Sequence, residues 1–137
     1  MDAERIKYLE MIQEVIKRMA TNSFALKGWA VTLIAGIFAL SSKEANAIFF
    51  LDTYVPVILF WFLDSYYLQL ERKYRVLYKK VVATDCSIVD FDLTPPLGNA
   101  EDRTTFLLCL FSLTELGFYF PCALLVSVVI ILANLIV

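Results

Sequence analysis

The sequence predicts an all-α membrane protein in which three transmembrane helices carry a helical extension on the cytosolic side. Hydrophobic residues make up 60% of the 137 positions, whereas soluble proteins have about 45–50% apolar residues. They gather in long runs near residues 24–42, 47–68 and 106–137, and a helix needs roughly 20 apolar residues to cross a bilayer core. The charged residues, 19% of the chain, fall mostly between these runs. We therefore expect a single membrane domain over residues 1–137.

Residues 3–22 are predicted to form an amphipathic helix on the cytosolic side of the membrane. Hydrophobic side chains recur at spacings of three and four residues, which places them on one face of a helix. This first stripe contains Leu9, Ile12, Ile16 and Met19. The segment carries too many charges to cross a bilayer, so it lies in the membrane interface or packs on another cytosolic helix.

The first transmembrane helix is expected over residues 24–42, after Asn22 and Ser23, which are both good N-cap residues. Small side chains recur along it at a spacing of four residues. They are Gly28, Thr32 and Gly36. Such a stripe lets two helix backbones approach closely in lipid, so we expect a neighbouring helix on this face, from the same chain or from another copy.

The second transmembrane helix is expected over residues 47–68, after a short turn at 41–46. Its outer end has two interpretations. In the first, Pro56 kinks one continuous helix. In the second, Asp52 caps a helix that begins at Thr53.

This second helix is predicted to continue into the cytosol to about residue 82, because no proline or glycine lies between residues 64 and 82. Hydrophobic side chains again repeat at three and four residues, in the pattern of a coiled coil. This second stripe contains Tyr67, Leu70, Tyr74 and Leu77. The two stripes are expected to pack antiparallel and to serve in the assembly of several copies.

Residues 83–101 contain two prolines, a glycine and several acidic residues, and are predicted to form a loop. The hydrophobic run that follows is too long for one perpendicular helix. We expect an interfacial helix over 102–114 and the third transmembrane helix over 116–137, with a break at Glu115 and Gly117. A two-helix hairpin folded at Glu115–Pro121 is the alternative, although its first arm is short.

The basic residues are distributed unequally between the two sides of the predicted membrane. Eleven of the twelve lie in residues 1–27 and 65–103, and the twelfth, Lys43, lies in the turn between the first two spans. Cytosolic segments of membrane proteins carry an excess of lysine and arginine. The sequence therefore predicts a cytosolic N-terminus, and three spans then place the C-terminus on the outer side.

Four charged residues in or beside the predicted spans are candidates for function. Lys27 and Asp64 lie at similar depth on neighbouring antiparallel helices, which predicts an intramembrane ion pair that is structural or part of a gate. Asp52 faces the outer half, where it is a helix cap or, repeated around an oligomer, an acidic ring that favours cations. Glu115 is the other candidate pore or selectivity residue, and otherwise ends a helix at the cytosolic interface.

The composition argues against an enzyme and against nucleic-acid binding. The chain has no histidine, which removes the commonest general base and metal ligand. Its three cysteines, Cys86, Cys109 and Cys122, lack the spacing of a zinc site, so we expect no metal and no cofactor. A formal net charge of −2 gives no basic field for nucleic acid.

Two blocks of the sequence carry a resemblance to a known family. They read NSFALKGW over residues 22–29 and FWFLDSYYLQLER over residues 60–72. In these blocks the chain resembles a widespread family of short bacterial inner-membrane proteins. Its size and layout are similar to the small multispan effectors of bacterial anti-phage defence, which assemble and breach the membrane. The resemblance implies a location in the bacterial inner membrane and no catalytic residues.

Three helices cannot enclose a path for water, so a pore needs several copies of this chain. We therefore expect a homo-oligomeric pore or channel, which the resemblance suggests is a defence effector. The alternative is a non-conducting scaffold or accessory subunit that recruits a cytosolic protein through the helical extension and the 83–101 loop. The expected partners are membrane lipid, further copies of the chain and, for the scaffold, that cytosolic protein.

Overall fold

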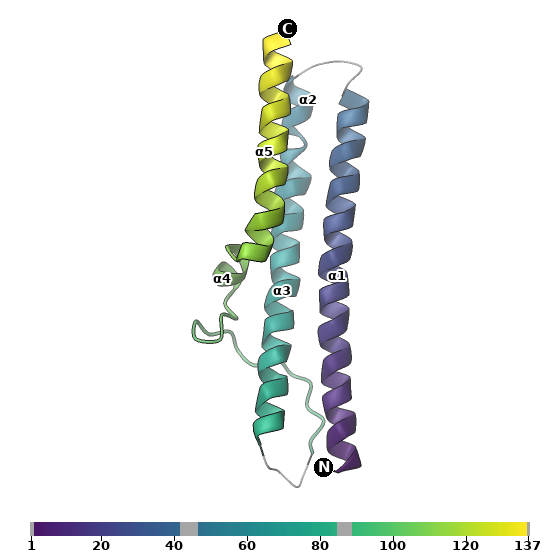
Figure 1. Cartoon of the computed structure of the whole chain (residues 1–137), viewed down its shortest axis with the longest axis vertical. Coiled ribbons are helices and arrows are strands. Elements are labelled where there is room, and N and C mark those ends of the chain that lie inside the picture. The colour runs from purple at the N-terminus through teal and green to yellow at the C-terminus, as the bar shows by residue number, and fades with distance from the viewer. Residues whose placement is uncertain (1, 42–46, 85–88, 137) are drawn as a thin grey trace.

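The computed structural model describes residues 2–41, 47–84 and 89–136, and all regular structure within them is α-helical, which confirms the all-α part of the predicted fold class. Three long helices stand side by side (Figure 1). They are α1 (Ala3–Ser41), α3 (Tyr54–Ala83) and α5 (Leu113–Ile136). Two five-residue helices, α2 (Ala47–Leu51) and α4 (Phe106–Leu110), precede α3 and α5. Apart from Ser41, the predicted turn with Lys43 lies outside the described residues, as does Cys86.

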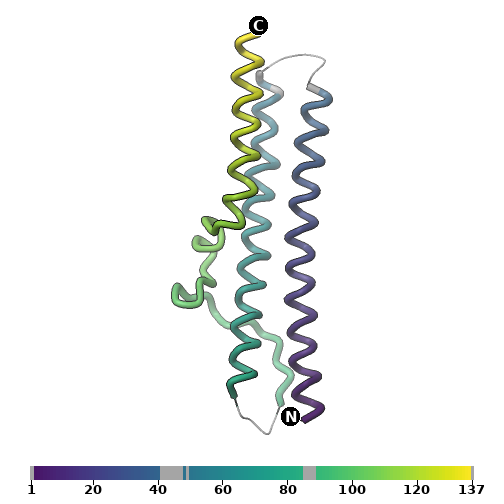
Figure 2. Tube along the Cα trace, in the orientation of Figure 1, coloured from purple at the N-terminus to yellow at the C-terminus, as the bar shows by residue number. Residues whose placement is uncertain are grey.

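Helix α1 is uninterrupted, so the prediction of separate helices over 3–22 and 24–42 is wrong. Its 39 residues span about 58 Å at 1.5 Å per residue. Asn22 and Ser23 are good N-caps, but inside a helix such residues cost only up to about 0.7 kcal/mol each relative to alanine. Helix α3 lies along α1 on both sides of this point (Figure 2), so packing outweighs the local preference for a break.

The second predicted helix is divided in two, which decides between the interpretations of its outer end. Helix α2 ends at Leu51, and α3 begins at Tyr54 after a short turn. The backbone N–H of Val55 donates to the Asp52 carbonyl at 3.2 Å. Pro56 lies in the first turn of α3, where its missing N–H costs no helical hydrogen bond. The continuous helix kinked at Pro56 is therefore wrong, and the new helix begins one residue later than the capping interpretation expected.

The chain around Ser112 also differs from the prediction. The expected helix over 102–114 is reduced to α4, and the break lies at Phe111 and Ser112 rather than at Glu115 and Gly117, which are inside α5. The backbone N–H of Glu115 donates to the Ser112 hydroxyl at 3.4 Å, so Ser112 occupies the N-cap position of α5. The alternative hairpin does not form, because α5 continues as one helix to its end.

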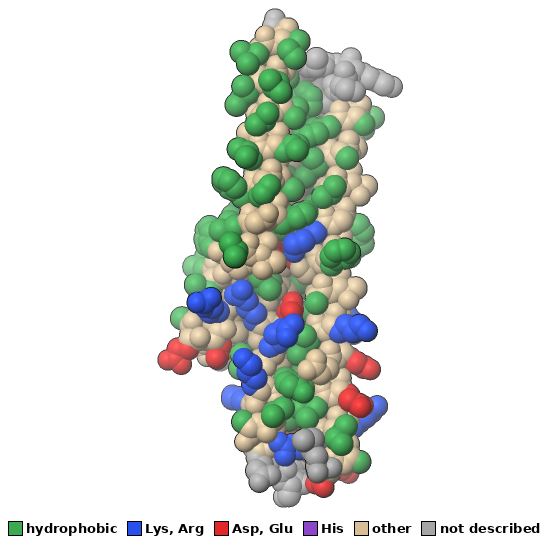
Figure 3. Space-filling view, viewed as in Figure 1, with side chains coloured by type: hydrophobic (Ala, Val, Ile, Leu, Met, Phe, Trp, Pro, Cys, Tyr) green, Lys and Arg blue, Asp and Glu red, His purple; other side chains and the backbone are tan. Residues whose placement is uncertain are grey.

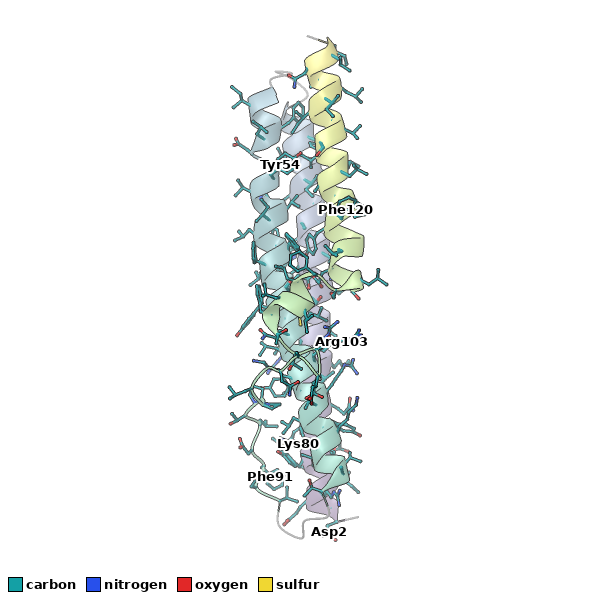
Figure 4. The ribbon with its side chains drawn as sticks, turned by 90° about the vertical axis from the view of Figure 1, so that its left-hand side faces the viewer. Asp2, Tyr54, Lys80, Phe91, Arg103 and Phe120 are labelled. Carbon is teal, nitrogen blue, oxygen red and sulfur yellow. The ribbon has the colours of Figure 1, made fainter. Side chains whose placement is uncertain are left out.

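The bundle has two halves that pack differently. In one half, α1 and the C-terminal part of α3 run antiparallel, and the extended segment 89–99, which carries Phe91 (Figure 4), lies against them. The rings of Tyr8 and Phe91 meet edge to face with centroids 5.7 Å apart. In the other half, α5 joins α1 and α3. The buried core of this half consists of Ala30, Ile34, Val57 and Tyr119.

Two of the described helices are long and apolar enough to cross a membrane, where the sequence predicted three. They are Ala3–Leu40 of α1 and all of α5. Only 17% of the apolar window in α1 and 11% of that in α5 is buried within the chain, whereas the core helix of a soluble protein is mostly buried. Helix α3 does not qualify, because its apolar stretch begins at Tyr54 and meets Asp64.

Charged side chains gather on one half of the face seen in Figure 3. On the face drawn in Figure 3, the lysine, arginine and acidic side chains gather over the half that contains the start of α1, and hydrophobic side chains cover the half that contains the end of α5. Such a division is compatible with a membrane protein that places one half in lipid and the other in water.

Candidate functional site

Three helices bring three charged side chains together where α5 joins α1 and α3. The Lys27 ammonium on α1 lies 2.5 Å from Oδ2 of Asp64 on α3 and 3.5 Å from Oε1 of Glu115 on α5. The side chains of both acids are 0% exposed, and that of Lys27 is 18% exposed. Together with Ser23 and Tyr119, these residues form what we call the polar cluster.

Asp64 is the most fully bonded member of the polar cluster. Its Oδ1 accepts a hydrogen bond from the Ser23 hydroxyl. Its Oδ2 accepts one from the Lys27 ammonium at 2.5 Å and one from the Tyr119 hydroxyl at 2.9 Å. A buried carboxylate is stable only when it is paired and hydrogen-bonded, and these three donors from α1 and α5 meet that requirement.

Helical spacing explains how the neighbours of the ion pair reach it. Ser23 and Lys27 are four residues apart on α1, and Lys27 donates to the Ser23 hydroxyl at 3.1 Å. Glu115 and Tyr119 are four residues apart on α5. Residues at this spacing share one face of a helix. The sequence interpretation used Ser23 as a helix cap and did not include Tyr119, although this spacing was the available signal for both.

Glu115 differs from Asp64 in its bonding. Its carboxyl group is completely buried, and neither of its oxygens has a hydrogen-bond partner among the described residues. Its closest opposite charge is the Lys27 ammonium, which lies nearer to Asp64. Glu115 also faces the interior of a single chain rather than a surface that several copies could share, which removes it as a pore-lining residue in this arrangement.

Apolar and aromatic groups surround the polar cluster. The Phe118 ring centroid lies 5.8 Å from the Lys27 ammonium, within the range of a cation–π contact. The indole N–H of Trp61 donates to the Leu110 carbonyl at 3.0 Å and so fastens α4 to α3. Beyond the cluster, the hydroxyl groups of Tyr54 and Ser127 lie 2.5 Å apart and join α3 to α5, and Figure 4 shows Tyr54 on the side of α3 towards α5.

The remaining residues predicted within the spans lie away from the polar cluster. Asp52 is exposed in the turn between α2 and α3. Gly28, Thr32 and Gly36 are exposed on α1, and a Cβ atom added at either glycine would meet no atom within 4 Å. Within the described part of the chain, no helix therefore covers the small-residue face of α1.

The two hydrophobic stripes of residues 9–19 and 67–77 are used largely within one chain. Ile12 and Ile16 are buried in a cluster against which Tyr74 and Leu77 pack. Leu9 is buried as well, and Met19, Tyr67 and Leu70 are half-buried. The stripes thus hold α1 against α3, which leaves less of them for assembly between copies than the sequence interpretation expected.

The extended segment is tied to the same end of the bundle by polar contacts. The Tyr8 hydroxyl donates to the Asp92 carbonyl, and the Arg5 guanidinium donates to the Val81 carbonyl at 2.9 Å. Hydrogen bonds from the side chain and backbone of Thr94 lower the pKa of Asp92, and burial raises the pKa of Tyr8. These groups fix the loop in place and form no reactive constellation.

Among the described residues, no group of three or more histidine, cysteine, aspartate or glutamate side chains is placed to hold a metal ion. Comparisons of the chain with protein-family models, with curated proteins and with solved structures found no match. The function is therefore argued from the geometry of this chain and from the resemblance in its two sequence blocks.

Proposed function

We propose that the chain is a multi-pass protein of the bacterial inner membrane whose copies assemble into a pore or channel, in the manner of the anti-phage effectors that it resembles. Its N-terminus lies in the cytosol and its C-terminus outside. Besides α1 and α5, residues 47–68 also cross the membrane as the second of three spans, with α2 and the first part of α3 lying beside the apolar parts of α1 and α5.

The exposed small-residue face of α1 carries this proposal. Gly28 and Gly36 have open space beside them, and the Thr32 hydroxyl is already bonded to the Gly28 carbonyl at 2.9 Å. The face is thus compact and has no unmet hydrogen bond at Thr32, which suits close contact with another helix in lipid. A second copy of the chain is the proposed neighbour, because three helices cannot enclose a water path alone.

Three further residues take roles in the proposed pore. Asp52 is exposed at the outer end and supplies the acidic ring that favours cations. The Lys27–Asp64 pair holds α1 and α3 together at the cytosolic depth, and its rupture is the proposed gate. Glu115 has no place in the lining, because its side chain is buried within one chain.

The proposal is tested by measuring oligomeric state and ion flux for purified protein, in detergent and in liposomes respectively. Gly36→Leu fills the small-residue face, and we expect it to reduce both the oligomer and the flux. Gly117→Leu is the matched control, because Gly117 is also an exposed glycine with open space around it. Asp52→Asn should keep the oligomer and lower the preference for cations.

A specific observation also favours the alternative, a scaffold that recruits a cytosolic protein. Leu97 lies in the loop next to Pro95 and Pro96 and is 92% exposed. An apolar side chain left in water on an ordered loop is suited to contact with another protein. Liposomes that stay sealed with wild-type protein would reject the pore and favour this scaffold.

A further inference from the structure

We infer that the buried carboxyl group of Glu115 is a proton-binding site, so that the polar cluster takes up and releases a proton. This inference does not rest on the proposed pore, since all the groups involved belong to one chain. It follows from the balance of charge in the cluster, from the bonding of each acid and from the space around Glu115.

The charge of the cluster is unbalanced without a proton. Lys27 brings one positive charge to two buried acids, Asp64 and Glu115. With all three groups ionised the cluster holds one uncompensated negative charge away from water, which is a strongly unfavourable arrangement. One proton on one of the acids makes the cluster neutral.

The bonding of the two acids decides which of them holds the proton. Asp64 accepts three hydrogen bonds and lies 2.5 Å from the Lys27 ammonium, and such donors stabilise an ionised carboxylate. Glu115 has no hydrogen-bond donor among the described residues and lies 3.5 Å from the same ammonium. The proton therefore belongs on Glu115, where it costs no existing hydrogen bond.

A proton fits the site better than a metal cation. The Lys27 ammonium already occupies the position between the two acids, and a metal ion there would stand against a like charge. The titratable and charged groups that face Glu115 are Lys27 from α1, Asp64 from α3, Cys109 from α4 and Tyr119 from α5. Lys27, whose side chain is 18% exposed, connects the site to water.

Infrared spectroscopy of the full chain in lipid nanodiscs tests the inference. A protonated carboxylic acid has a carbonyl stretching band that a carboxylate lacks, and we expect this band at neutral pH in the wild-type protein. Glu115→Gln should abolish the band, and Glu101→Gln, a change at an exposed glutamate of the loop, should leave it unchanged. Raising the pH should remove the band from the wild-type protein.

Isotope labelling keeps the test decisive if Glu115→Gln fails to fold. Carbon-13 in the glutamate carboxyl groups should shift the band of the unaltered chain, and the same label in the aspartate carboxyl groups should not. A band that shifts with labelled aspartate would place the proton on an aspartate and overturn the inference. The absence of any such band at neutral pH would overturn it as well, as would a band that is lost only when sodium ions are added.

Discussion

Lys27 is the residue on which the interior of the bundle depends most. It is the cation shared by two buried acids, and its ammonium also donates to Ser23 and lies over the Phe118 ring. Removing one partner of a buried ion pair costs about 3–5 kcal/mol, because the other charge stays buried without compensation. The contribution of Lys27 to stability is therefore measured best by replacing Lys27 in two backgrounds, one with the Asp64 carboxylate and one without it.

We predict that Lys27→Met lowers the free energy of unfolding by about 3–5 kcal/mol, because Asp64 is then an unpaired buried charge. The double variant Lys27→Met with Asp64→Asn should recover a large part of this loss, since it leaves no unpaired charge at Asp64. Reversible unfolding in detergent micelles measures both values. Lys17→Met, a change at an exposed lysine of the same helix, should stay within about 0.5 kcal/mol of the wild-type protein. Additive losses in the double variant would show that Lys27 and Asp64 are not coupled.

The site could be predicted from the sequence only in part. Lys27 and Asp64 were placed together by counting residues outward from the turn between two antiparallel helices, and they do lie together. The four-residue spacing of Glu115 and Tyr119 indicates that they share a helix face, but it does not show that this face meets Lys27 and Asp64, because that depends on where α5 begins. A helix that starts after Ser112 rather than after Glu115 turns Glu115 from a helix-end residue into a buried one.

At the scale of elements, the differences from the sequence interpretation have a common origin. Capping preferences at Asn22 and Ser23 predict the start of a new helix, yet α1 continues through them because α3 packs alongside and Ser23 bonds to Asp64. The break that does occur, between α2 and α3, follows a local signal at Asp52 and Pro56. The local signals at Asp52 and Pro56 thus set a helix boundary, whereas those at Asn22 and Ser23 are outweighed where α3 supplies contacts to α1 on both sides.

The loop that precedes α4 contains a glycine position that admits no side chain. A Cβ atom at Gly98 would lie 2.7 Å from the Thr104 carbonyl oxygen, which accepts a hydrogen bond from the Gln69 amide at 3.0 Å. We predict that Gly98→Ala lowers the free energy of unfolding by about 1–3 kcal/mol, because the backbone of the loop must move away from α3.

The matched change at Gly117 should alter the free energy of unfolding in the opposite direction. Gly117 lies inside α5 with open space around it, so Gly117→Ala should raise the free energy of unfolding by up to about 1 kcal/mol through helix propensity alone. Both values come from the same unfolding titration. A neutral Gly98→Ala would show that the loop is not held against Gln69 as described.

At the scale of the whole molecule, whether α3 can cross a membrane depends more on the helices around it than on its own composition. By itself it is not apolar enough to count as a candidate span, unlike α1 and α5. It packs against both of those helices, so its Asp64 and Ser65 are buried by protein. A helix whose polar residues face the interior of a bundle can cross a bilayer with fewer apolar residues than a single helix needs. A span over residues 47–68 is therefore part of the proposal.

Labelling of substituted cysteines tests whether α3 crosses the membrane. In a chain whose three native cysteines are replaced by alanine, Asp52→Cys and Leu97→Cys place single thiols at exposed positions before and after α3. We predict that a membrane-impermeant maleimide labels Asp52→Cys in intact bacterial cells and labels Leu97→Cys only after the cells are opened. The physical reason is the unequal distribution of lysine and arginine, which predicts that the loop lies in the cytosol. Leu135→Cys, near the end of α5 and in the exposed part of that helix, should be labelled from outside as well. If the reagent reached Asp52→Cys and Leu97→Cys equally in intact cells, both ends of α3 would lie on one side, and the chain would have two spans.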